Sequence, residues 1–306
     1  MNREGKMKIA ITGAKGFVGK NCIEYLKDVY EVVGLYREKD IGRFGEIPDI
    51  EYRGTSYSVE SLKGALEGCD AIVHLAARKV ISKEPNGLAE YSENFSTLQN
   101  ILKAAQSLKI NNIITISTRC VYGNYTTTSF KENDKLFPIN FYGLEKVMEE
   151  QLCEYYNNMF NLNIKVLRLS QVISDDISDK NIFSVFIKQA LNDEMISIYG
   201  QGSAIRDYIY IKDVCKGIKN ALSHKEQKGI YNFASGTGVQ LENLANLVIE
   251  KSHSKSTITH IESSNEDTSR IILNVEKMNK ELDFSIEYST ERMIEDIMKD
   301  YINEKK

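Results

Sequence analysis

The sequence contains few residues of the types that bind metals or form disulfides. Its five cysteines are widely scattered and form no C-x-x-C pair, so they indicate neither a zinc site nor a disulfide framework. None of its four histidines stands at metal-ligand spacing from another. Scattered cysteines are typical of a reducing compartment, and we expect a cytoplasmic protein without a metal site.

Long apolar segments and an excess of positive charge are also missing. The longest apolar runs fall far short of the roughly 18 residues that a membrane helix needs, and residues 1–8 are charged, unlike a signal segment. The net charge of −4 argues against a basic face that binds nucleic acid. With 42% hydrophobic and 27% charged residues among 306, the composition is that of a soluble globular protein. We therefore expect neither a membrane nor a nucleic acid among its partners.

One glycine-rich stretch follows directly on apolar residues 9–11, with the spacing G-x-x-G-x-x-G. Apolar residues after it recur at helical spacing, so the order is strand, tight turn and helix. The first glycine permits the turn, the second the approach of a pyrophosphate, and the third close packing of helix on strand. The alternative is a loop that uses glycine only for turning. The dinucleotide contacts predicted here are Gly13, Gly16, Phe17, Val18 and Gly19.

Further along, apolar strand patterns alternate with helical patterns. The expected strands are residues 31–36, 69–77, 113–118 and 164–169, and the longest expected helices are 90–108 and 142–160. This alternation indicates a parallel sheet covered on both faces. We therefore predict an α/β fold, with a doubly wound parallel sheet over residues 1–170. The pattern then loosens, and residues 171–306 are expected to form a smaller α/β substrate lobe, interleaved with the sheet, in which Asp213 caps a helix.

The end of the strand 31–36 predicts which dinucleotide is bound. An acidic residue there favours NAD through the ribose hydroxyls, whereas an arginine favours the 2′-phosphate of NADP. Here Tyr36 is followed by Arg37, and the first acidic residue is Glu38. We expect NADP or NAD, with a preference for NADP. The alternative is that Arg37 is a solvated surface charge.

The strand that ends near residue 77 supplies a second set of predicted cofactor contacts. Leu75, Ala76 and Ala77 leave room for a cofactor across the carboxyl end of the strand. Lys79 follows where a cation reaches the phosphates or the nicotinamide ribose; the alternative is a solvent-facing lysine. Asn94 lies in the expected helix 90–108 and is also predicted to contact the cofactor, the alternative being an exposed helix residue.

Tyr142 and Lys146 stand four residues apart in the expected helix 142–160, so both project from one face. A free tyrosine titrates near about 10, too high for a base at neutral pH. A lysine ammonium one turn away and an oxidised nicotinamide ring both lower that pKa. The pair therefore suits proton exchange with a sugar or alcohol hydroxyl, and the hydroxyl of Thr118 would orient the substrate oxygen. The alternative is an ordinary amphipathic helix in which Tyr142 is half-buried.

Together these features resemble the extended short-chain dehydrogenase/reductase family, in particular its nucleotide-sugar epimerases and dehydratases. The resemblance covers nearly the whole chain and implies a Rossmann fold that binds NADP or NAD. The residues that carry it are Thr12–Gly19, His74–Ala77, Asn94, Ser117, Thr118, Val121–Gly123, Tyr142, Lys146, Arg168, Arg206–Tyr208 and Asp213.

The resemblance also implies roles for individual residues. Tyr142 matches the acid/base, Lys146 its tuning partner and ribose ligand, and Thr118 the hydroxyl that holds the substrate oxygen. Asn181 and Arg206 match contacts to the substrate's diphosphate, a task that suits arginine because it bonds phosphate in a bidentate manner.

Two further matches concern the cofactor and the type of reaction. Lys79 matches a cofactor-binding lysine of the galactose epimerases. The dehydratases carry Thr-Asp-Glu where this chain has Thr118, Arg119 and Cys120, and elimination of water needs that acid and base. We therefore expect no 4,6-dehydratase activity.

Three functional hypotheses follow. The first is a nucleotide-sugar 4-epimerase, in which a hydride leaves C4 and returns to its other face. The second is an NADPH-dependent reductase of a nucleotide-linked 4-keto-deoxysugar, which Arg37 favours. The third is a non-catalytic NADP-binding sensor. The resemblance also implies a homodimer formed through the helices around residues 94–108 and 142–160.

Overall fold

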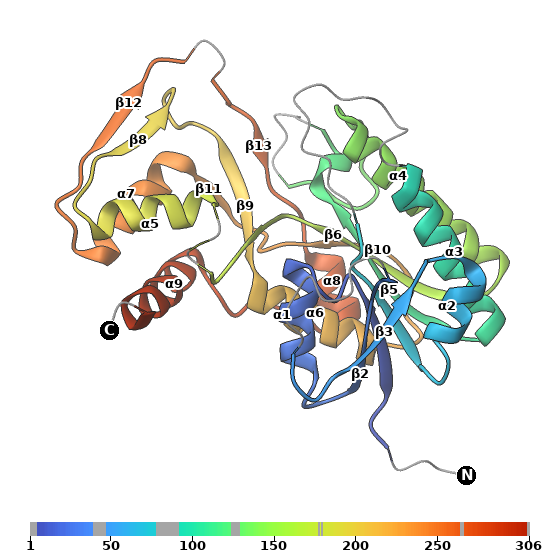
Figure 1. The fold of residues 1–306 in the computed structure, drawn as a ribbon. Coiled ribbons are helices and arrows are strands. Elements are labelled where there is room, and N and C mark those ends of the chain that lie inside the picture. Colours follow the sequence, from blue (N-terminus) through green and yellow to red (C-terminus); the bar gives the residue numbers. More distant parts are fainter. Residues whose placement is uncertain are drawn as a thin grey trace.

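The computed structural model describes residues 5–38, 47–77, 92–123, 129–176, 178, 180–263 and 266–304. Its centre is a seven-stranded parallel sheet with the order β10-β6-β5-β4-β1-β2-β3 (Figure 1). These strands are β1 (Lys8–Thr12), β2 (Glu31–Arg37), β3 (Glu51–Thr55), β4 (Ala71–His74), β5 (Asn112–Thr118), β6 (Asn163–Leu169) and β10 (Gly229–Phe233). The strand order reverses between β1 and β4, and ligands of doubly wound sheets bind in the crevice at such a reversal.

Helices cover both faces of this sheet. α2 (Val59–Ala65), α3 (Ser92–Leu108) and α4 (Phe141–Met159) pack side by side over one face. α1 (Phe17–Leu26) and α6 (Ile211–Ser223) pack together over the other, and α8 (Glu276–Leu282) packs against β10. The predicted α/β fold with a doubly wound parallel sheet is therefore confirmed.

The central strands are mainly apolar because both of their faces are buried, although β6 also buries Lys165 and Arg168. In β1, Ile9 and Ile11 belong to the core under α1 and α6, whereas Ala10 belongs to the core under α2, α3 and α4. Successive side chains of a strand point to opposite faces, so a strand covered on both sides buries most of its side chains.

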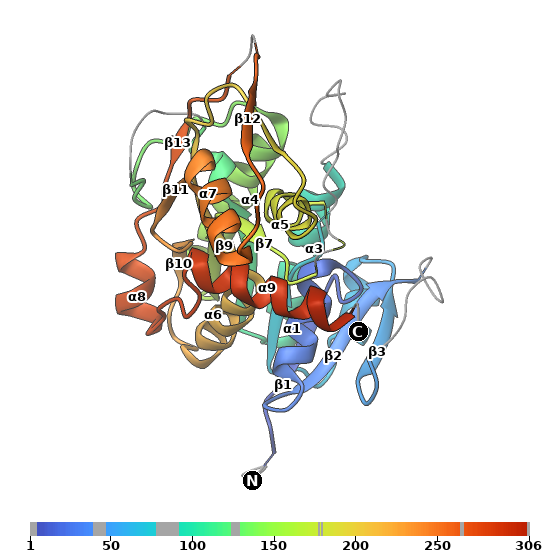
Figure 2. The same cartoon turned by 90° about the vertical axis from the view of Figure 1, so that its left-hand side faces the viewer.

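A smaller lobe is built from elements that follow β6. One sheet contains β7 (Gln171–Ile173), β9 (Ile205–Tyr210), β11 (Gly238–Gln240) and β13 (Arg270–Ile271), and a parallel pair contains β8 (Ile196–Tyr199) and β12 (Ile258–Ile261). α5 (Ile182–Leu191), α7 (Leu241–Ser252) and α9 (Thr290–Glu304) pack against one another, and Figure 2 shows α9 across the front of the molecule. Because α6 and β10 return to the main sheet, the chain crosses repeatedly between the two bodies.

The expectation for Asp213 is wrong. α6 begins at Ile211, and Asp213 lies within its first turn rather than at its cap. Its buried carboxylate accepts hydrogen bonds from the backbone N–H groups of Glu287 and Tyr288, at 2.8 and 3.1 Å. Asp213 therefore ties the segment before α9 to α6, which spacing along the chain does not reveal.

Two structural features are absent from the described part of the chain. None of its helices has both the length and the apolar character needed to cross a lipid bilayer. It also brings together no group of three or more His, Cys, Asp or Glu side chains that would hold a metal ion.

Candidate functional site

The glycine-rich turn lies at the carboxyl end of β1, where the strand order reverses. Gly13 has a φ of +68°, and a Cβ there would stand 2.8 Å from the backbone nitrogen of Ala76. A Cβ on Gly19 would stand 2.1 Å from the carbonyl oxygen of Gly13. α1 begins at Phe17, and its N-cap is Gly16, which has no side chain to bond the first N–H groups of the helix. The turn is therefore shaped for an anion that approaches bare backbone, as a pyrophosphate does.

Thr12 holds the segment after β4 against this turn. Its Oγ1 accepts hydrogen bonds from the backbone N–H groups of Leu75 and Ala76, each at 3.1 Å, and lies 2.8 Å from Nδ1 of His74. This contact fits a neutral His74 whose Nδ1 accepts the proton of the Thr12 hydroxyl. Burial acts in the same direction and lowers the pKa of His74 to about 4.

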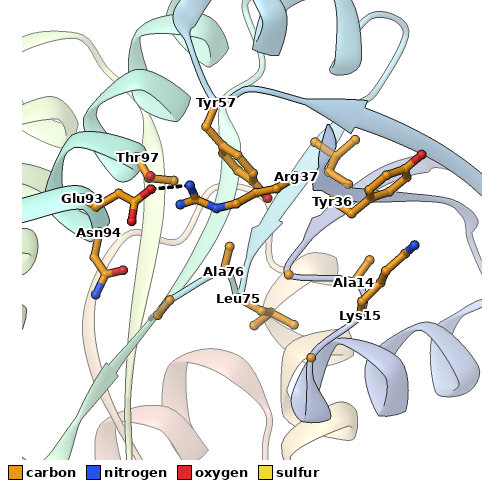
Figure 3. Close-up of a pocket in the computed structure, with 14 residues that line it drawn as sticks. Ala14, Lys15, Tyr36, Arg37, Tyr57, Leu75, Ala76, Glu93, Asn94 and Thr97 are labelled. Atoms are coloured by element: carbon orange, nitrogen blue, oxygen red, sulfur yellow. Dashed lines mark hydrogen bonds and ion pairs between the residues drawn. The ribbon is translucent and has the colours of Figure 1, made fainter. Parts of the chain in front are cut away.

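A cavity of about 560 Å³ opens over the turn (Figure 3), within the range of small-molecule sites. Its lining comprises Gly13, Ala14, Lys15, Gly16, Leu35, Tyr36, Arg37, Tyr57, Leu75, Ala76, Ala77, Glu93, Asn94 and Thr97. Most of the predicted cofactor contacts are thus brought together. Phe17, Val18 and Gly19 lie in the first turn of α1 outside this lining. Lys79 lies outside the described residues.

Arg37, the last residue of β2, lines the cavity, and its side chain is 30% exposed. Its guanidinium forms an ion pair with Glu93 in the first turn of α3 and lies 5.3 Å from the ring centre of Tyr57. On the other side of the cavity, Nζ of Lys15 lies 4.2 Å from the ring centre of Tyr36 (Figure 3). A cofactor phosphate that bonds Arg37 would therefore compete with a carboxylate.

Thr118 and Tyr142 come from different elements that pack together. Thr118 ends β5, and its Oγ1 accepts a hydrogen bond from the backbone N–H of Cys120 at 3.3 Å. Tyr142 lies in the first turn of α4, which begins where the Asn140 side chain caps the N–H of Gly143 at 2.8 Å. A Cβ on Gly143 would stand 2.5 Å from the carbonyl oxygen of Cys120. Glycine therefore lets α4 start directly against the turn that follows Thr118.

Lys146 is buried one helical turn after Tyr142. Its Nζ donates a hydrogen bond to Oε2 of Glu149 at 2.7 Å. Burial lowers the pKa of Lys146, but the acidic neighbours, Glu149 first, outweigh burial and raise that pKa above its ordinary value. Burial raises the pKa of Tyr142 by more than the Lys146 ammonium lowers it. The site therefore holds a charged lysine beside a protonated phenol.

A buried ion pair fixes the strand ends behind this site. Arg168 on β6 donates hydrogen bonds to both carboxylate oxygens of Glu150 on α4, at 2.9 and 2.7 Å, and to the Tyr122 hydroxyl at 2.7 Å. Ser117, the neighbour of Thr118 on β5, donates to the same carboxylate. β5, β6 and α4 are thus joined directly behind Thr118.

The two predicted diphosphate contacts lie in the smaller lobe. Asn181 caps α5: its Oδ1 accepts hydrogen bonds from the N–H groups of Phe183 and Ser184, while within the described residues its buried Nδ2 has no partner. Arg206 on β9 pairs with Asp267. Burial and then the charge of Arg119 lower the pKa of Arg206, against the effect of Asp267. Arg206 is thus within electrostatic range of the turn after Thr118.

The chain matches the model of the NAD dependent epimerase/dehydratase family over residues 9–234. It belongs to this family. The resemblance predicted from the sequence is thereby confirmed, and the family match spans the glycine turn, β5, α4 and the first half of the smaller lobe.

Among relatives, the uncharacterized UDP-glucose epimerase YtcB of Bacillus subtilis is 30% identical, over 82% of this chain and 84% of its own. Among solved structures, a UDP-N-acetylglucosamine 4-epimerase from Bacillus cereus is 28% identical, with a TM-score of 0.83 over 96% of each chain. A UDP-glucuronic acid 4-epimerase from the same organism, in complex with UDP-glucuronic acid and NAD, is 26% identical. Its TM-score is 0.81, over 98% of this chain and 100% of that one.

Sequence reasoning about this member of the epimerase/dehydratase family missed two acidic residues. Glu145 and Glu149 flank Lys146 and are 2% and 3% exposed. On α4 they look like ordinary surface charges of an amphipathic helix, because Glu and Lys are rarely buried. One signal in the sequence was the spacing of Glu145 and Glu149, which are four residues apart and therefore lie on one side of the helix that also carries Lys146.

Proposed function

We propose that the protein is an NAD(P)-dependent nucleotide-sugar epimerase that inverts C4 of a nucleotide-linked hexose. The observation that carries the proposal is that α4, the helix of Tyr142 and Lys146, begins against the turn that follows Thr118 on β5. A cavity opens over the glycine turn of the same sheet. Family membership and the 4-epimerase activity named for the two similar Bacillus cereus structures support the same reaction.

The residues of the cavity fit a nicotinamide dinucleotide. Bare backbone at Gly13 and Gly16 admits a pyrophosphate, and the uncapped start of α1 attracts it. Within the glycine turn, we assign cofactor contacts to Gly13, Gly16, Phe17, Val18 and Gly19. The remaining contacts assigned are Arg37, Leu75, Ala76, Ala77, Lys79, Asn94, Tyr142 and Lys146.

The proton chemistry falls to Tyr142. A bound oxidised nicotinamide would supply the acceptor and donor for the C4 hydride, and its positive charge would add to that of Lys146. Tyr142 takes the proton of the C4 hydroxyl in the first half of the reaction and returns it in the second. The hydroxyl of Thr118 orients the oxygen, and the ammonium of Lys146 stabilises the phenolate. Proton and hydride both end on the sugar, so there is no net oxidation.

The smaller lobe, within residues 171–306, is assigned to the substrate. The buried Nδ2 of Asn181 suits a phosphate oxygen, since it lacks a partner within the described residues. Arg206 supplies a guanidinium already in a polar, half-buried place, and a diphosphate would replace Asp267 as its partner. A nucleotide sugar is the substrate that brings a diphosphate and a C4 hydroxyl together.

Arg37 favours a second candidate, an NADPH-dependent reductase of a nucleotide-linked 4-keto sugar. That reaction uses the same hydride and proton at C4, but its cofactor leaves after each turnover. A preference for NADP rests on Arg37 alone, and Glu93 opposes it, because the carboxylate already neutralises the guanidinium. A non-catalytic NADP-binding sensor is the weakest candidate, since it requires neither Tyr142 nor Lys146.

The residues after Thr118 argue against 4,6-dehydratase activity. Loss of water across C5 and C6 needs an acid and a base beside the sugar. Arg119 and Cys120 occupy the two following positions and supply no carboxylate.

We also assign a homodimer to the outer faces of α3 and α4. Tyr155 and Met159 on α4 are 54% and 63% exposed and lie one helical turn apart, so they form apolar surface that a second copy would cover. Replacing both with glutamate should convert a dimer into monomers in sedimentation experiments. A wild-type protein that sediments as a monomer would contradict this assignment.

Two experiments test the proposal: identification of the nucleotide bound to the purified protein, and a screen of nucleotide sugars as substrates. Nucleotide extracted from the purified protein should be NAD(P), retained through purification for an epimerase, whereas a reductase takes up NADPH from solution. UDP-, dTDP-, GDP- and CDP-hexoses should then be screened for conversion to the C4 epimer without added cofactor. No conversion of any of them, with either cofactor, would contradict the enzymatic proposal and favour the sensor.

A further inference from the structure

Two carboxyl groups are buried beside Lys146 with too few hydrogen-bond donors. Glu145 and Glu149 lie four residues apart on α4, so they share one side of the helix. The ammonium of Lys146 satisfies Oε2 of Glu149. Both oxygens of Glu145 and the second oxygen of Glu149 are buried and have no hydrogen-bond partner within the described residues.

Among the described residues, Lys146 is the one positive charge that acts on these two acids. The neutral Asn94 side chain of α3 faces Glu145 and lowers the pKa of that carboxyl, and His74 of β4 faces Glu149. His74 is neutral at neutral pH, because burial lowers its pKa to about 4. Cys120 faces Tyr142, and the buried Cys153 lies one turn after Glu149 with a pKa raised by burial, so neither thiol adds a positive charge.

Two carboxylates in this place cannot both be charged. Burial and the neighbouring Glu149 raise the pKa of Glu145 to about 9, whereas Lys146 holds the pKa of Glu149 below its ordinary value in spite of burial. A single proton between the two groups supplies the missing donor, because a protonated carboxyl donates to a carboxylate. The cluster of Lys146, Glu149 and protonated Glu145 is then electrically neutral.

We propose that Glu145 and Glu149 share one proton at neutral pH and that this carboxyl pair is a positioning group, which holds Lys146 and sets how strongly its charge acts on Tyr142. The second part rests on the proposed function of Tyr142. Glu149 opposes the effect of Lys146 on the phenol, so Tyr142 stays protonated until further positive charge arrives. A second ionised carboxylate would push the ionisation of Tyr142 to still higher pH.

Two substitutions separate this arrangement from a purely structural one. Glu145→Gln keeps the shape and neutrality of a protonated Glu145, so it should leave the pH at which Tyr142 ionises unchanged. Glu149→Gln removes the charge that opposes Lys146 and should lower that pH by about one unit or more. Glu154→Gln, a partly exposed position on the same helix, is the matched control and should change nothing.

Infrared spectroscopy and carbon-13 NMR test the proposal, and both work without substrate or turnover. Infrared spectra of the full-length protein should show a protonated-carboxyl C=O band at neutral pH that disappears in Glu145→Gln and titrates near pH 9 in the wild type. Carbon-13 NMR of labelled tyrosine, with Tyr142→Phe to assign the signal, reports the ionisation of Tyr142. A wild-type spectrum without the band overturns the shared proton, even where Glu149→Gln fails to fold.

The NMR result decides the positioning role. An unchanged Tyr142 titration in folded Glu149→Gln overturns it, and so does a fall in Glu145→Gln equal to that in Glu149→Gln, because Glu145 would then be ionised. A protein that has the band and the shift but converts no nucleotide sugar would refute the proposed function and leave the carboxyl pair standing.

Discussion

Arg37 at the end of β2 is paired with Glu93 in the first turn of α3, across the cavity that Gly13 and Gly16 line. The pair joins two elements on either side of the expected adenosine end of a dinucleotide. An arginine in this position is the usual partner of the NADP 2′-phosphate. Here that phosphate would have to displace a carboxylate.

Glu93→Gln should therefore strengthen binding of NADPH. With the carboxylate gone, the guanidinium of Arg37 is available for charge-assisted bonds to the 2′-phosphate, and we expect affinity for NADPH to rise about tenfold. Affinity for NADH should change little, since it lacks the phosphate. Titration by calorimetry checks both. An equal change for the two cofactors would mean that Arg37 does not contact the 2′-phosphate.

Gly143→Ala should destabilise the protein and impair the site. The added Cβ would stand 2.5 Å from the carbonyl oxygen of Cys120, so the start of α4 must move away from the turn after Thr118. We expect a loss of about 1–3 kcal/mol in the free energy of unfolding, measured with urea, and lower activity from a displaced Tyr142.

Gly64→Ala is the matched control for that substitution. Gly64 lies in α2, is exposed, and a Cβ there would meet nothing within 4 Å. Alanine in a helix should raise the free energy of unfolding by about 0.5–1 kcal/mol. Equal losses in the two variants would contradict the packing argument for Gly143.

His74 should make the fold sensitive to acid. Its folded-state pKa of about 4 lies below the ordinary value of 6.5, so folding favours the neutral ring. That contribution is complete above pH 6.5 and is lost as the pH falls from 6.5 to 4. It amounts to on the order of 3 kcal/mol for a group that stays fully buried.

His74→Gln keeps an acceptor for the Thr12 hydroxyl but cannot be protonated. Urea unfolding of both proteins at several pH values between 4 and 6.5 should show a smaller acid loss in the variant. Parallel curves for the two proteins would show that His74 is not the group that titrates.

Local sequence patterns were sufficient to predict the sheet and the glycine turn. Parallel strands covered on both faces are mainly apolar, and the close approaches at Gly13 and Gly19 tolerate no Cβ. Local spacing also predicted that Tyr142 and Lys146 lie in one helix, one turn apart.

Long-range partners were not predictable in this way. Arg37 and Glu93 are 56 positions apart, and Asp213 binds backbone 74 and 75 positions away. The burial of Glu145 and Glu149 follows from the packing of α3 and β5 on α4, whereas the sequence shows only charged residues in a helix.

The most direct test of the account is the C4 configuration of a nucleotide sugar after incubation with wild-type protein and with Tyr142→Phe. Proton NMR of the sugar distinguishes the two epimers, and calorimetry confirms that the variant still binds the cofactor. We predict that the wild type interconverts the epimers and that the variant is slower by about 10²–10⁴-fold. Conversion by Tyr142→Phe at the wild-type rate would contradict the assignment of the proton to Tyr142.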